Sequence, residues 1–498
     1  MTRKLLLLFL LIPTLLVAAD ATIPDSQLLL MKNDSPLVAF RILFRNGSAN
    51  DPAGKEGLAA LTSSMIDQAS TKTNDYQKIL ELLYPMAASY SAQVDKEMTV
   101  VYGVTHKDNL TAYYNLLRDA ILSPAFKQDD FDRVKTDQLN YVAKSLRFND
   151  DEELAKETLN WGIFKNHPYG HPDAGLVSSI QKLTLDDVKN YYAANYTRKD
   201  ITIGIAGDYP DSLVAQVKKD FSALPAGETT GELKLPTPTV SDWNVILVDK
   251  QTPATGFTFG FPIPLTRADD DYYPLMVAAS WMGQHRSSVG HLFQVIREVR
   301  GLNYGDYAYI EYFPFGGRYF QPLPNVARHQ QIFEIWIRPV QNQNRQFALR
   351  MAARELQKLI DNGLTKEDFE LTRNFLLNYS VNLAQSNSEM LGYSLDDRFY
   401  GLKSPYLDTV RTRLNTMTVD DVNKAIKKYL SSTNMVVTIV GQDAATFAKA
   451  IEDNTPSPIT YESPKPDAVT QEDKQIEAYS LPVKPDHVTV IPADKIFQ

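Results

Sequence analysis

The sequence predicts an α+β protein of two homologous domains, each with a mainly antiparallel sheet covered by helices. The first observation is a repeat: LTLDDVKNYYAANYTRKDITIGIAGD (183–208) and MTVDDVNKAIKKYLSSTNMVVTIVGQD (417–443) align without a gap at an offset of 234. A second pair, DFDRVKTDQLNY (130–141) and DFELTRNFLLNY (368–379), follows the same order at an offset of 238. A period this long excludes a solenoid and indicates a duplicated domain. Strands mixed with helical pairs, without strict alternation, favour sheets covered on one face.

The chain divides into parts in sequence order. The predicted parts are a signal peptide (1–19), a first domain (22–223), a linker rich in Pro, Gly and Thr (224–242), a second domain (243–451) and an irregular C-terminal tail (452–498). Each domain opens with a strand pattern, LVAFRILFRNGSAND (37–51) or WNVILVDKQTPATGFTFGFPIP (243–264), and continues with amphipathic helices. Both copies contain T-x-D-D-V, in which the threonine can cap a helix whose first turn carries two acids.

The N-terminal stretch has the features of a secretory signal. Arg3 and Lys4 precede an apolar run from Leu5 to Ala19, which is short for a membrane span and ends in residues suited to signal-peptidase cleavage. An uncleaved anchor is the alternative. No later segment is long and apolar enough to cross a membrane.

The net charge and the lack of cysteine limit which partners and which cellular compartment suit this chain. Removing residues 1–19 takes away two basic residues and no acid, so the net charge of −9 becomes −11. A chain this acidic is a poor candidate for nucleic acid or anionic lipid. The sequence has no cysteine, which excludes disulfides, thiolate metal sites and a cysteine nucleophile. An exported protein without disulfides suits the bacterial periplasm.

The sequence resembles the M16 metallopeptidases, the family of insulinase, pitrilysin and the mitochondrial processing peptidase. The resemblance spans about residues 25–450 and rests on FRNGSANDPAGKEGLA, the loop HPYGHP (167–172), the T-x-D-D-V helix, the IAGD strand end and LFQVIREVRGLNYG (292–305). It implies duplicated halves that close around a peptide in a clam-like chamber.

The metal site of this family is missing from the sequence. Active members carry HxxEH on the helix after the first strand and turn, where two histidines four residues apart bind Zn²⁺ and the glutamate acts as base. The corresponding positions here hold Ala60, Ser63 and Ser64. The third ligand, a later glutamate, is also absent, because there is no glutamate between Glu97 and Glu152. We therefore expect no metal and no cofactor on this chain.

The second domain retains an arginine and a tyrosine that the family places opposite the zinc. Arg297 and Tyr304 have the family's spacing of seven residues. The resemblance implies that Arg297 binds a backbone oxygen or carboxylate of the substrate, and that Tyr304 donates its phenolic proton to the scissile carbonyl. The alternative is an ion pair of Arg297 with Glu298 or Asp306, with Tyr304 as core packing.

Three functions compete. The first is an accessory subunit of a two-chain M16 zinc metallopeptidase, in which a sister chain supplies HxxEH and Zn²⁺ and this chain supplies Arg297 and Tyr304 to act on a peptide substrate. The second is a non-catalytic scaffold or peptide-binding module. The third, metal-independent hydrolysis, has no supporting nucleophile. The surviving pair discriminates the first two, since a scaffold has no chemical need for it.

Two further patterns concern the histidines and an aromatic stretch. His167 and His171 lie in a proline-rich loop that we interpret as structural, a loop metal pair being the alternative. His285 and His291 precede Arg297 and are expected to be solvent-exposed, the alternative being that they line the same cleft as Arg297. The aromatic stretch YAYIEYFPFGGRYFQPLP (307–324) predicts two strands joined by a turn, either as a peptide-binding strand edge or as plain core.

Overall fold

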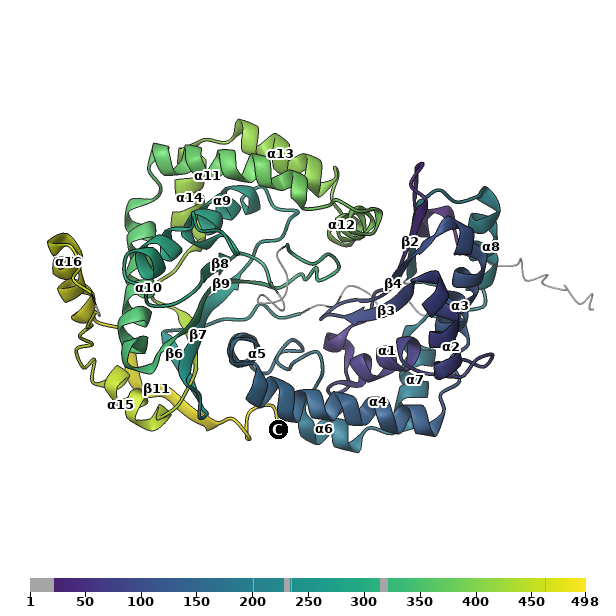
Figure 1. The fold of residues 1–498 in the computed structure, drawn as a ribbon, viewed down its shortest axis with the longest axis horizontal. Helices are drawn as coiled ribbons and strands as arrows, with labels where there is room; N and C mark the ends of the chain where they lie inside the picture. The colour runs from purple at the N-terminus through teal and green to yellow at the C-terminus, as the bar shows by residue number, and fades with distance from the viewer. Residues whose placement is uncertain (1–21, 200, 228–232, 234, 314–320, 462) are drawn as a thin grey trace, which may run out of the picture.

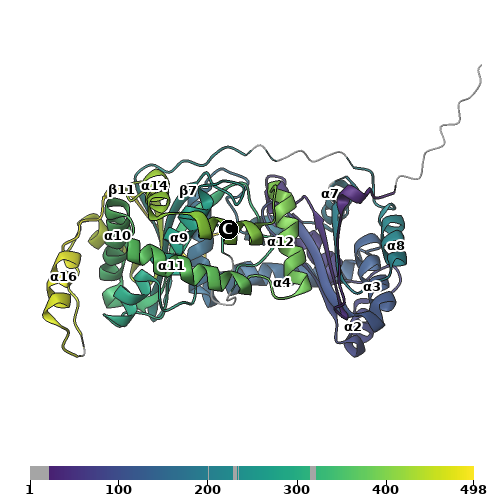
Figure 2. The same cartoon turned by 90° about the horizontal axis from the view of Figure 1, so that it is seen from above.

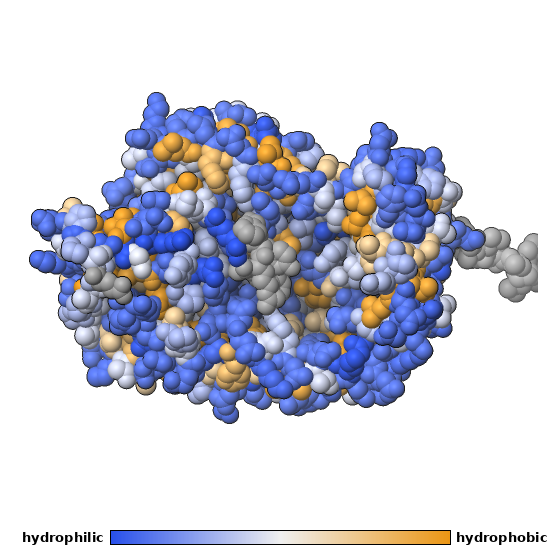
Figure 3. Space-filling model, viewed as in Figure 1, coloured by the Kyte–Doolittle hydropathy of each residue, from blue (hydrophilic) through white to orange (hydrophobic). Residues whose placement is uncertain are grey.

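The computed structural model describes residues 22–199, 201–227, 233, 235–313, 321–461 and 463–498. It has two lobes that face each other, each built on one sheet with helices around it (Figure 1). The predicted signal peptide (1–19) lies outside the described residues, as do residues 228–232 and 234 of the predicted linker. Hydrophilic residues dominate the face in Figure 3, and hydrophobic ones form separate patches on it. Within the described ranges, no helix is long and apolar enough to cross a membrane.

The first lobe holds five strands. Its elements are η1 (Asp25–Gln27), β1 (Leu28–Lys32), β2 (Leu37–Phe44), η2 (Ser48–Asn50), α1 (Leu58–Asp67), α2 (Tyr76–Leu83), η3 (Tyr84–Met86), β3 (Ser89–Val94), β4 (Thr99–His106), η4 (Lys107–Asn109), α3 (Leu110–Leu122), α4 (Gln128–Asn140), the π-helix η5 (Tyr141–Asn149), α5 (Asp151–Ile163), α6 (Val177–Lys182), α7 (Leu185–Asn195), β5 (Ile201–Gly207) and α8 (Asp211–Phe221).

The second lobe holds six strands. Its elements are β6 (Trp243–Asp249), β7 (Ala254–Ile263), α9 (Tyr272–Gly283), the π-helix η6 (Phe293–Glu298), β8 (Asp306–Tyr309), β9 (Gln331–Gln341), η7 (Asn342–Asn344), α10 (Arg345–Asn362), α11 (Lys366–Tyr379), η8 (Ser380–Asn382), α12 (Asn387–Tyr400), α13 (Tyr406–Thr416), α14 (Val419–Tyr429), β10 (Met435–Gly441), α15 (Ala444–Glu452), α16 (Asp467–Glu477) and β11 (Val483–Pro492).

The two sheets have the same strand order, which confirms the predicted duplication. The first runs β1-β5-β2-β4-β3 and the second runs β11-β6-β10-β7-β9-β8, so β6 to β8 repeat the first sheet. In each, the first two repeated strands are parallel and the others are antiparallel. The sheets are therefore mainly antiparallel, as predicted.

The T-x-D-D-V motifs form the helix caps that their sequence predicts. The hydroxyl of Thr184 accepts a hydrogen bond from the backbone N–H of Asp187, and the Asp187 carboxylate accepts one from the backbone N–H of Thr184. Thr418 and Asp421 repeat both bonds at the start of α14. These reciprocal bonds satisfy backbone N–H groups that a helix start leaves free.

Each lobe lends one helix to the sheet of the other lobe. α12, from the second half of the chain, packs on β2 and β5, whereas α5, from the first half, packs on β7 and β10 (Figures 1 and 2). Along β2, alternate residues Val38 and Phe40 face the helices of their own lobe, while Ala39 and Leu43 face the side of α12. Both faces of each sheet are thus covered, rather than the single face that the order of strands and helices favours.

The end of the chain is more regular than predicted. Residues 452–498 contain α16 and β11, and β11 joins the second sheet as an edge strand parallel to β6, with Val488 opposite Val245. The prediction of an irregular tail is therefore wrong. An edge strand that is mostly exposed needs no alternation of apolar and polar residues, so its sequence gives no strand signal. The prolines of residues 452–498 also favoured an irregular segment over a helix or strand.

The aromatic hairpin expected over 307–324 is also absent from the described part of that stretch. Only Asp306–Tyr309 forms a strand, and its partner is β9 rather than a strand before residue 324. Residues 314–320 of the expected hairpin lie outside the described residues.

The packing of α12 on the first sheet can be tested at Leu391. Its side chain is fully buried and lies on Gly204 of β5, where an added Cβ would come within 2.8 Å of it. We expect Leu391→Ala to lower the free energy of unfolding by about 2–5 kcal/mol, because it leaves a cavity between lobes. Urea denaturation measures this, with Leu371→Ala on the exposed face of α11 as control. Equal losses in the two variants would contradict the packing.

Candidate functional site

The helix α1 carries the positions where the resemblance expects metal ligands. Ala60 and Ser64 are half-buried, and Ser63 is 2% exposed. Alanine has no lone pair, and a neutral serine hydroxyl is a poor Zn²⁺ ligand and no base at neutral pH. Leu61 and Met65 of the same helix lie in the core of the first lobe. The helix is therefore held by apolar packing.

The start of α1 is built without any contribution from a metal. Gly57 precedes the helix with φ +100°, and a Cβ there would lie 2.6 Å from the carbonyl oxygen of Ala174. The carboxylate of Asp51 accepts hydrogen bonds of 2.7 Å from the backbone N–H groups of Gly57 and Ala59. Burial raises the pKa of Asp51 to about 8, even though these bonds oppose the rise.

The neighbouring helix α4 supplies an amide rather than a carboxylate. The Gln138 side chain is buried, and its Nε2 donates bonds of 2.8 Å to the carbonyl oxygens of Gly57 and Ala174. Within the described ranges, no group of three or more His, Asp or Glu side chains could hold a metal ion. The residues present at α1 and α4 do not fit a zinc ion.

Arg297 and Tyr304 lie next to each other at the surface of the second lobe. The Arg297 guanidinium lies 5.5 Å from the centre of the Tyr304 ring and 4.6 Å from that of Phe293. Tyr304 is 75% exposed, and the Arg297 side chain is 37% exposed. The contact of Arg297 with Glu298 is loose, with 3.9 Å between Nε and Oε1. The exposure of Tyr304 excludes the alternative in which it packs in the core.

Three buried charges and one partly buried carboxylate join the lobes, and we call them the interlobe ion cluster: Asp95, Lys96 and Arg328, with Asp173. Arg328 donates hydrogen bonds of 2.6 and 2.8 Å to Asp95, and Lys96 lies 2.8 Å from Asp173. The Arg328 guanidinium also lies 3.5 Å from the ring centre of Tyr312. Because the Arg328, Asp95 and Lys96 side chains are at most 3% exposed, these charges depend on one another for solvation.

A cavity of about 390 Å³ lies beside this cluster and is lined from both lobes. Glu153 and Glu157 of α5 contribute carboxyl groups to its wall. Glu157 accepts a hydrogen bond of 3.0 Å from the Tyr312 hydroxyl, whereas the Glu153 carboxyl has no hydrogen bond or ion pair with a described residue. Burial, helped by the charge of Glu157, raises the pKa of Glu153 to about 8. Glu153 is therefore mainly protonated at neutral pH.

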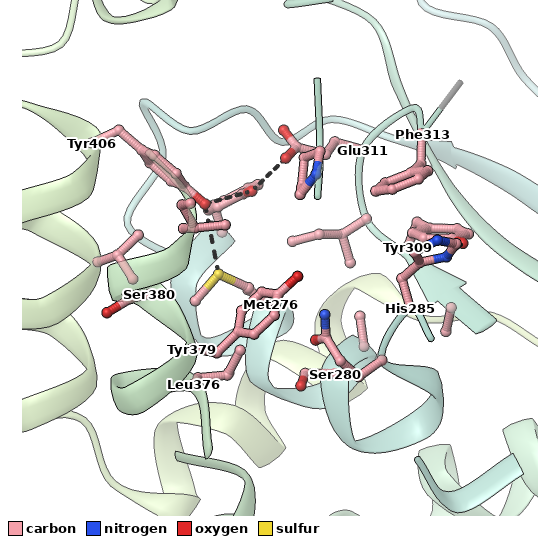
Figure 4. A pocket seen from close by; sticks show the side chains of 18 residues that line it. Met276, Ser280, His285, Tyr309, Glu311, Phe313, Leu376, Tyr379, Ser380 and Tyr406 are labelled. Atoms are coloured by element: carbon pink, nitrogen blue, oxygen red, sulfur yellow. Dashed lines mark hydrogen bonds between the residues drawn. The ribbon is translucent and has the colours of Figure 1, made fainter. Parts of the chain in front are cut away.

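A second, mostly apolar pocket of about 100 Å³ lies within the second lobe, between α9, α11, α13 and the segment after β8 (Figure 4). On one side the Tyr272 hydroxyl donates to Glu311 (3.1 Å) and lies 3.4 Å from the Tyr406 hydroxyl. Arg297 and Tyr304 do not line this pocket. It is separate from the predicted site.

The histidines differ from expectation in one respect. His285 and His291 are not the solvent-exposed residues that the loop sequence suggested: His285 is buried, with Nδ1 2.7 Å from the Tyr309 hydroxyl, and His291 Nε2 lies 2.7 Å from Glu355. His167 lies in the HPYG turn, where its Nδ1 accepts from the backbone N–H of Tyr169. These contacts give the histidines structural roles.

Sequence reasoning missed the residues that fix this geometry. Asp95 and Arg328 are 233 residues apart, and Arg300, which holds the segment between Arg297 and Tyr304, binds Asp473. No local periodicity connects partners so distant.

Comparisons with known proteins agree with the geometry of both lobes. Residues 28–175 match the model of insulinase (peptidase family M16), and residues 182–376 match the model of the peptidase M16 inactive domain. The chain belongs to the M16 peptidase family. The matched residues of the M16 models end before α16 and β11.

Relatives of this M16 chain include proteins with and without a peptidase description. A Helicobacter pylori protein described as a non-peptidase homolog, YmxG, is 23% identical over 412 residues, covering 81% of this chain and 89% of the relative. A Mycobacterium tuberculosis protein described as an uncharacterized zinc protease, Rv2782c, is 24% identical over 402 residues, covering 79% and 86%. The crystal structure of a peptidase M16 inactive domain from Pseudomonas fluorescens aligns with a TM-score of 0.73 at 22% identity, covering 83% of this chain and 95% of that one.

The side chains at the ligand positions and the similarity to these relatives agree. The chain is an inactive M16-like protein related to non-peptidase homologs. Its fold keeps both M16 lobes, while the side chains at Ala60, Ser63 and Ser64 cannot bind zinc.

The proton on Glu153 predicts a pH dependence of stability. The folded chain holds this proton to about pH 8, whereas an unfolded glutamate loses it near 4.3, so its stabilisation is present at low pH and is lost as the pH rises between these values. Glu153→Gln cannot titrate. We expect its stability relative to wild type to rise with pH across this window, by up to about 1.4 kcal/mol per pH unit.

Urea-unfolding midpoints at pH 5, 6, 7 and 8 measure this difference. The exposed Glu81→Gln variant is the control and should give a constant difference from wild type above pH 6. A difference between Glu153→Gln and wild type that does not change with pH would show that Glu153 is ionised in the folded protein.

Proposed function

We propose that this chain is the accessory, non-zinc-binding subunit of a two-chain M16-type zinc metallopeptidase that acts on peptides. The observation that carries the proposal is the Arg297–Tyr304 pair, whose side chains are adjacent and accessible to solvent. A tyrosine kept only for packing would be buried. Here the hydroxyl is free to meet a group from outside the chain, while the metal positions of the same chain hold Ala60, Ser63 and Ser64.

In this proposal a sister M16 chain with HxxEH would hold the zinc, and the bound metal would supply the activation of the attacking water. Tyr304 donates a hydrogen bond to the carbonyl oxygen of the scissile peptide as negative charge develops there. Arg297 pairs with a backbone oxygen or carboxylate of the substrate, because its guanidinium is charged at any working pH and binds oxygens in a fork. The loose contact of Arg297 with Glu298 leaves most of its donors available.

The proposal places the heterodimer outside the cytoplasm, in the bacterial periplasm. The periplasmic location is inferred from the sequence of residues 1–19 and from the lack of cysteine. Mass spectrometry of the mature chain tests this part, since retention of Met1 would contradict export.

The alternative is a non-catalytic scaffold or peptide-binding module. The interlobe ion cluster favours it, because buried pairs such as Arg328–Asp95 resist the opening of the two lobes. A scaffold gives no reason for an exposed tyrosine next to an arginine. We therefore rank it second.

Tyr304→Phe tests the proposed catalytic contact. The change removes only the hydroxyl, so folding and pairing with the sister chain should be nearly unchanged. We expect kcat of the reconstituted pair to fall by about 10²–10³, as for the loss of one donor to a developing oxyanion. Steady-state kinetics on a quenched peptide and a binding assay for the complex measure the two properties.

Matched variants separate this contact from a general surface effect. Tyr84→Phe changes a tyrosine that is 87% exposed on the first lobe and should leave kcat unchanged. Arg297→Ala should raise KM, because a contact with the substrate oxygen is lost. Full activity in Tyr304→Phe would favour the scaffold.

Zinc content provides an independent test. We expect this chain, purified alone, to hold well below one zinc per molecule, because no residue at positions 60, 63 or 64 is a zinc ligand. Elemental analysis of each separated subunit should find the zinc with the sister chain. One tightly bound zinc on this chain that is lost in Ser64→Ala would refute the proposal.

A further inference from the structure

A buried arginine lies between the two residues of the proposed site. Arg300 is three residues after Arg297, and its side chain is 1% exposed. Its Nε donates a hydrogen bond of 2.8 Å to Asp473, its Nη2 donates one of 2.9 Å to Glu472, and its Nη1 donates one of 2.9 Å to the backbone carbonyl of Val295. The two carboxylates belong to α16, which is more than 170 residues away in the sequence.

The helix α16 is itself fixed to the body of the lobe by the same two carboxylates. The second oxygen of Glu472 accepts hydrogen bonds from Arg354 (2.9 Å) and Lys358 (3.1 Å) of α10. The second oxygen of Asp473 accepts a bond of 2.9 Å from the Tyr461 hydroxyl. Burial opposes ionisation of Glu472, but the bonds from Arg354, Arg300 and Lys358 lower its pKa to about 2. Glu472 is therefore charged at any working pH.

The backbone around Arg300 is closed by further bonds. The N–H of Gly301 donates to the carbonyl of Arg297 (2.7 Å), and the N–H of Leu302 donates to that of Ile296 (3.2 Å). Lys465, in the segment that leads into α16, donates a bond of 2.8 Å to the carbonyl of Val299. The turn that follows Arg297 is thus tied to the tail of the chain by Arg300 and Lys465.

The other flank of Tyr304 is held in the same manner, by buried side chains. Asn303 and Asp306 are 6% and 1% exposed, and Asn303 donates a hydrogen bond of 2.6 Å to Asp306. Tyr304 lies between them and points away from the core, since it is 75% exposed. The direction of the exposed pair therefore depends on its neighbours in the chain, because Arg297 itself has only a loose ion pair with Glu298 and contacts with the Phe293 and Tyr304 rings among the described residues.

We propose that α16 is a positioning element: through Glu472 and Asp473 it holds Arg300, and so fixes the spacing and direction of Arg297 and Tyr304. This inference rests on the proposed function. Arg300, Glu472 and Asp473 are positioning residues and touch no substrate. Removing one carboxylate leaves the buried guanidinium partly unpaired. We expect the turn to loosen first, because the ion pairs of Arg300 are the buried charge pairs that join it to α16 among the described residues.

The test uses Asp473→Asn and, as the milder change at a half-exposed residue, Glu472→Gln in the full-length chain. Hydrogen exchange is measured for the backbone amides of residues 296–305, with the amides of β10, an inner strand of the second sheet, as reference. We expect exchange to become at least tenfold faster in residues 296–305 and to stay unchanged in β10. Asp467→Asn, an exposed acid at the start of the same helix, is the matched control and should change neither.

Kinetics of the reconstituted pair then distinguish positioning from a structural role. We expect Asp473→Asn to lower kcat at least tenfold in wild type and by much less in the Tyr304→Phe background, since it acts through Tyr304. Unchanged exchange in residues 296–305 would overturn the inference whatever the activity, as would equal kinetic effects in both backgrounds. If the wild-type pair cleaves no peptide, the proposed function fails and the positioning role fails with it. An active wild-type pair with fully active Asp473→Asn and Glu472→Gln overturns the inference alone.

Discussion

The apolar faces of two sheets have to be kept from water, and in this chain each half covers the other half's sheet with one helix. α12 lies on the first sheet and α5 on the second, where they cover the sheet face that is turned away from each lobe's own main core. α5 and α12 occupy equivalent places within the two copies of the duplicated domain. The exchange follows from duplication, because a helix that fits one copy of the sheet fits the other as well.

This exchange creates the environment in which the interlobe ion cluster exists. Asp95 and Arg328 come from different lobes and are buried only because the lobes stay together. In such a low-dielectric place, a pair with good geometry gains enough to offset its desolvation, while a single charge does not. The same setting explains Glu153, whose carboxyl has no hydrogen bond or ion pair with the residues that the structure describes and whose pKa is raised by burial. Helix exchange, ion cluster and protonated glutamate are therefore consequences of one packing arrangement.

Local features of the fold could be predicted from the sequence, and long-range ones could not. The caps at Thr184 and Thr418 were predictable because capping depends on residues three apart. The loss of ligands at Ala60, Ser63 and Ser64 was visible because HxxEH is also a local pattern. The partners of Arg300 and Arg328 were not, since they lie more than 170 residues away and a lone arginine gives no direction. β11 could not be predicted, because an exposed edge strand needs no alternation of apolar and polar residues.

The emptied helix shows why a metal site can be lost without the loss of the fold. In α1 the packing comes from Leu61 and Met65, and its start is fixed by Gly57 and the Asp51 carboxylate, none of which is a zinc ligand. The two half-buried positions, Ala60 and Ser64, are therefore free to change at little structural cost. The segment with Arg297 and Tyr304 differs, because it is held by buried charges from α16 and cannot drift independently of them. In both places the structure is held by residues beside the functional positions: Leu61, Met65 and Asp51 at α1, and Arg300 at the turn between Arg297 and Tyr304.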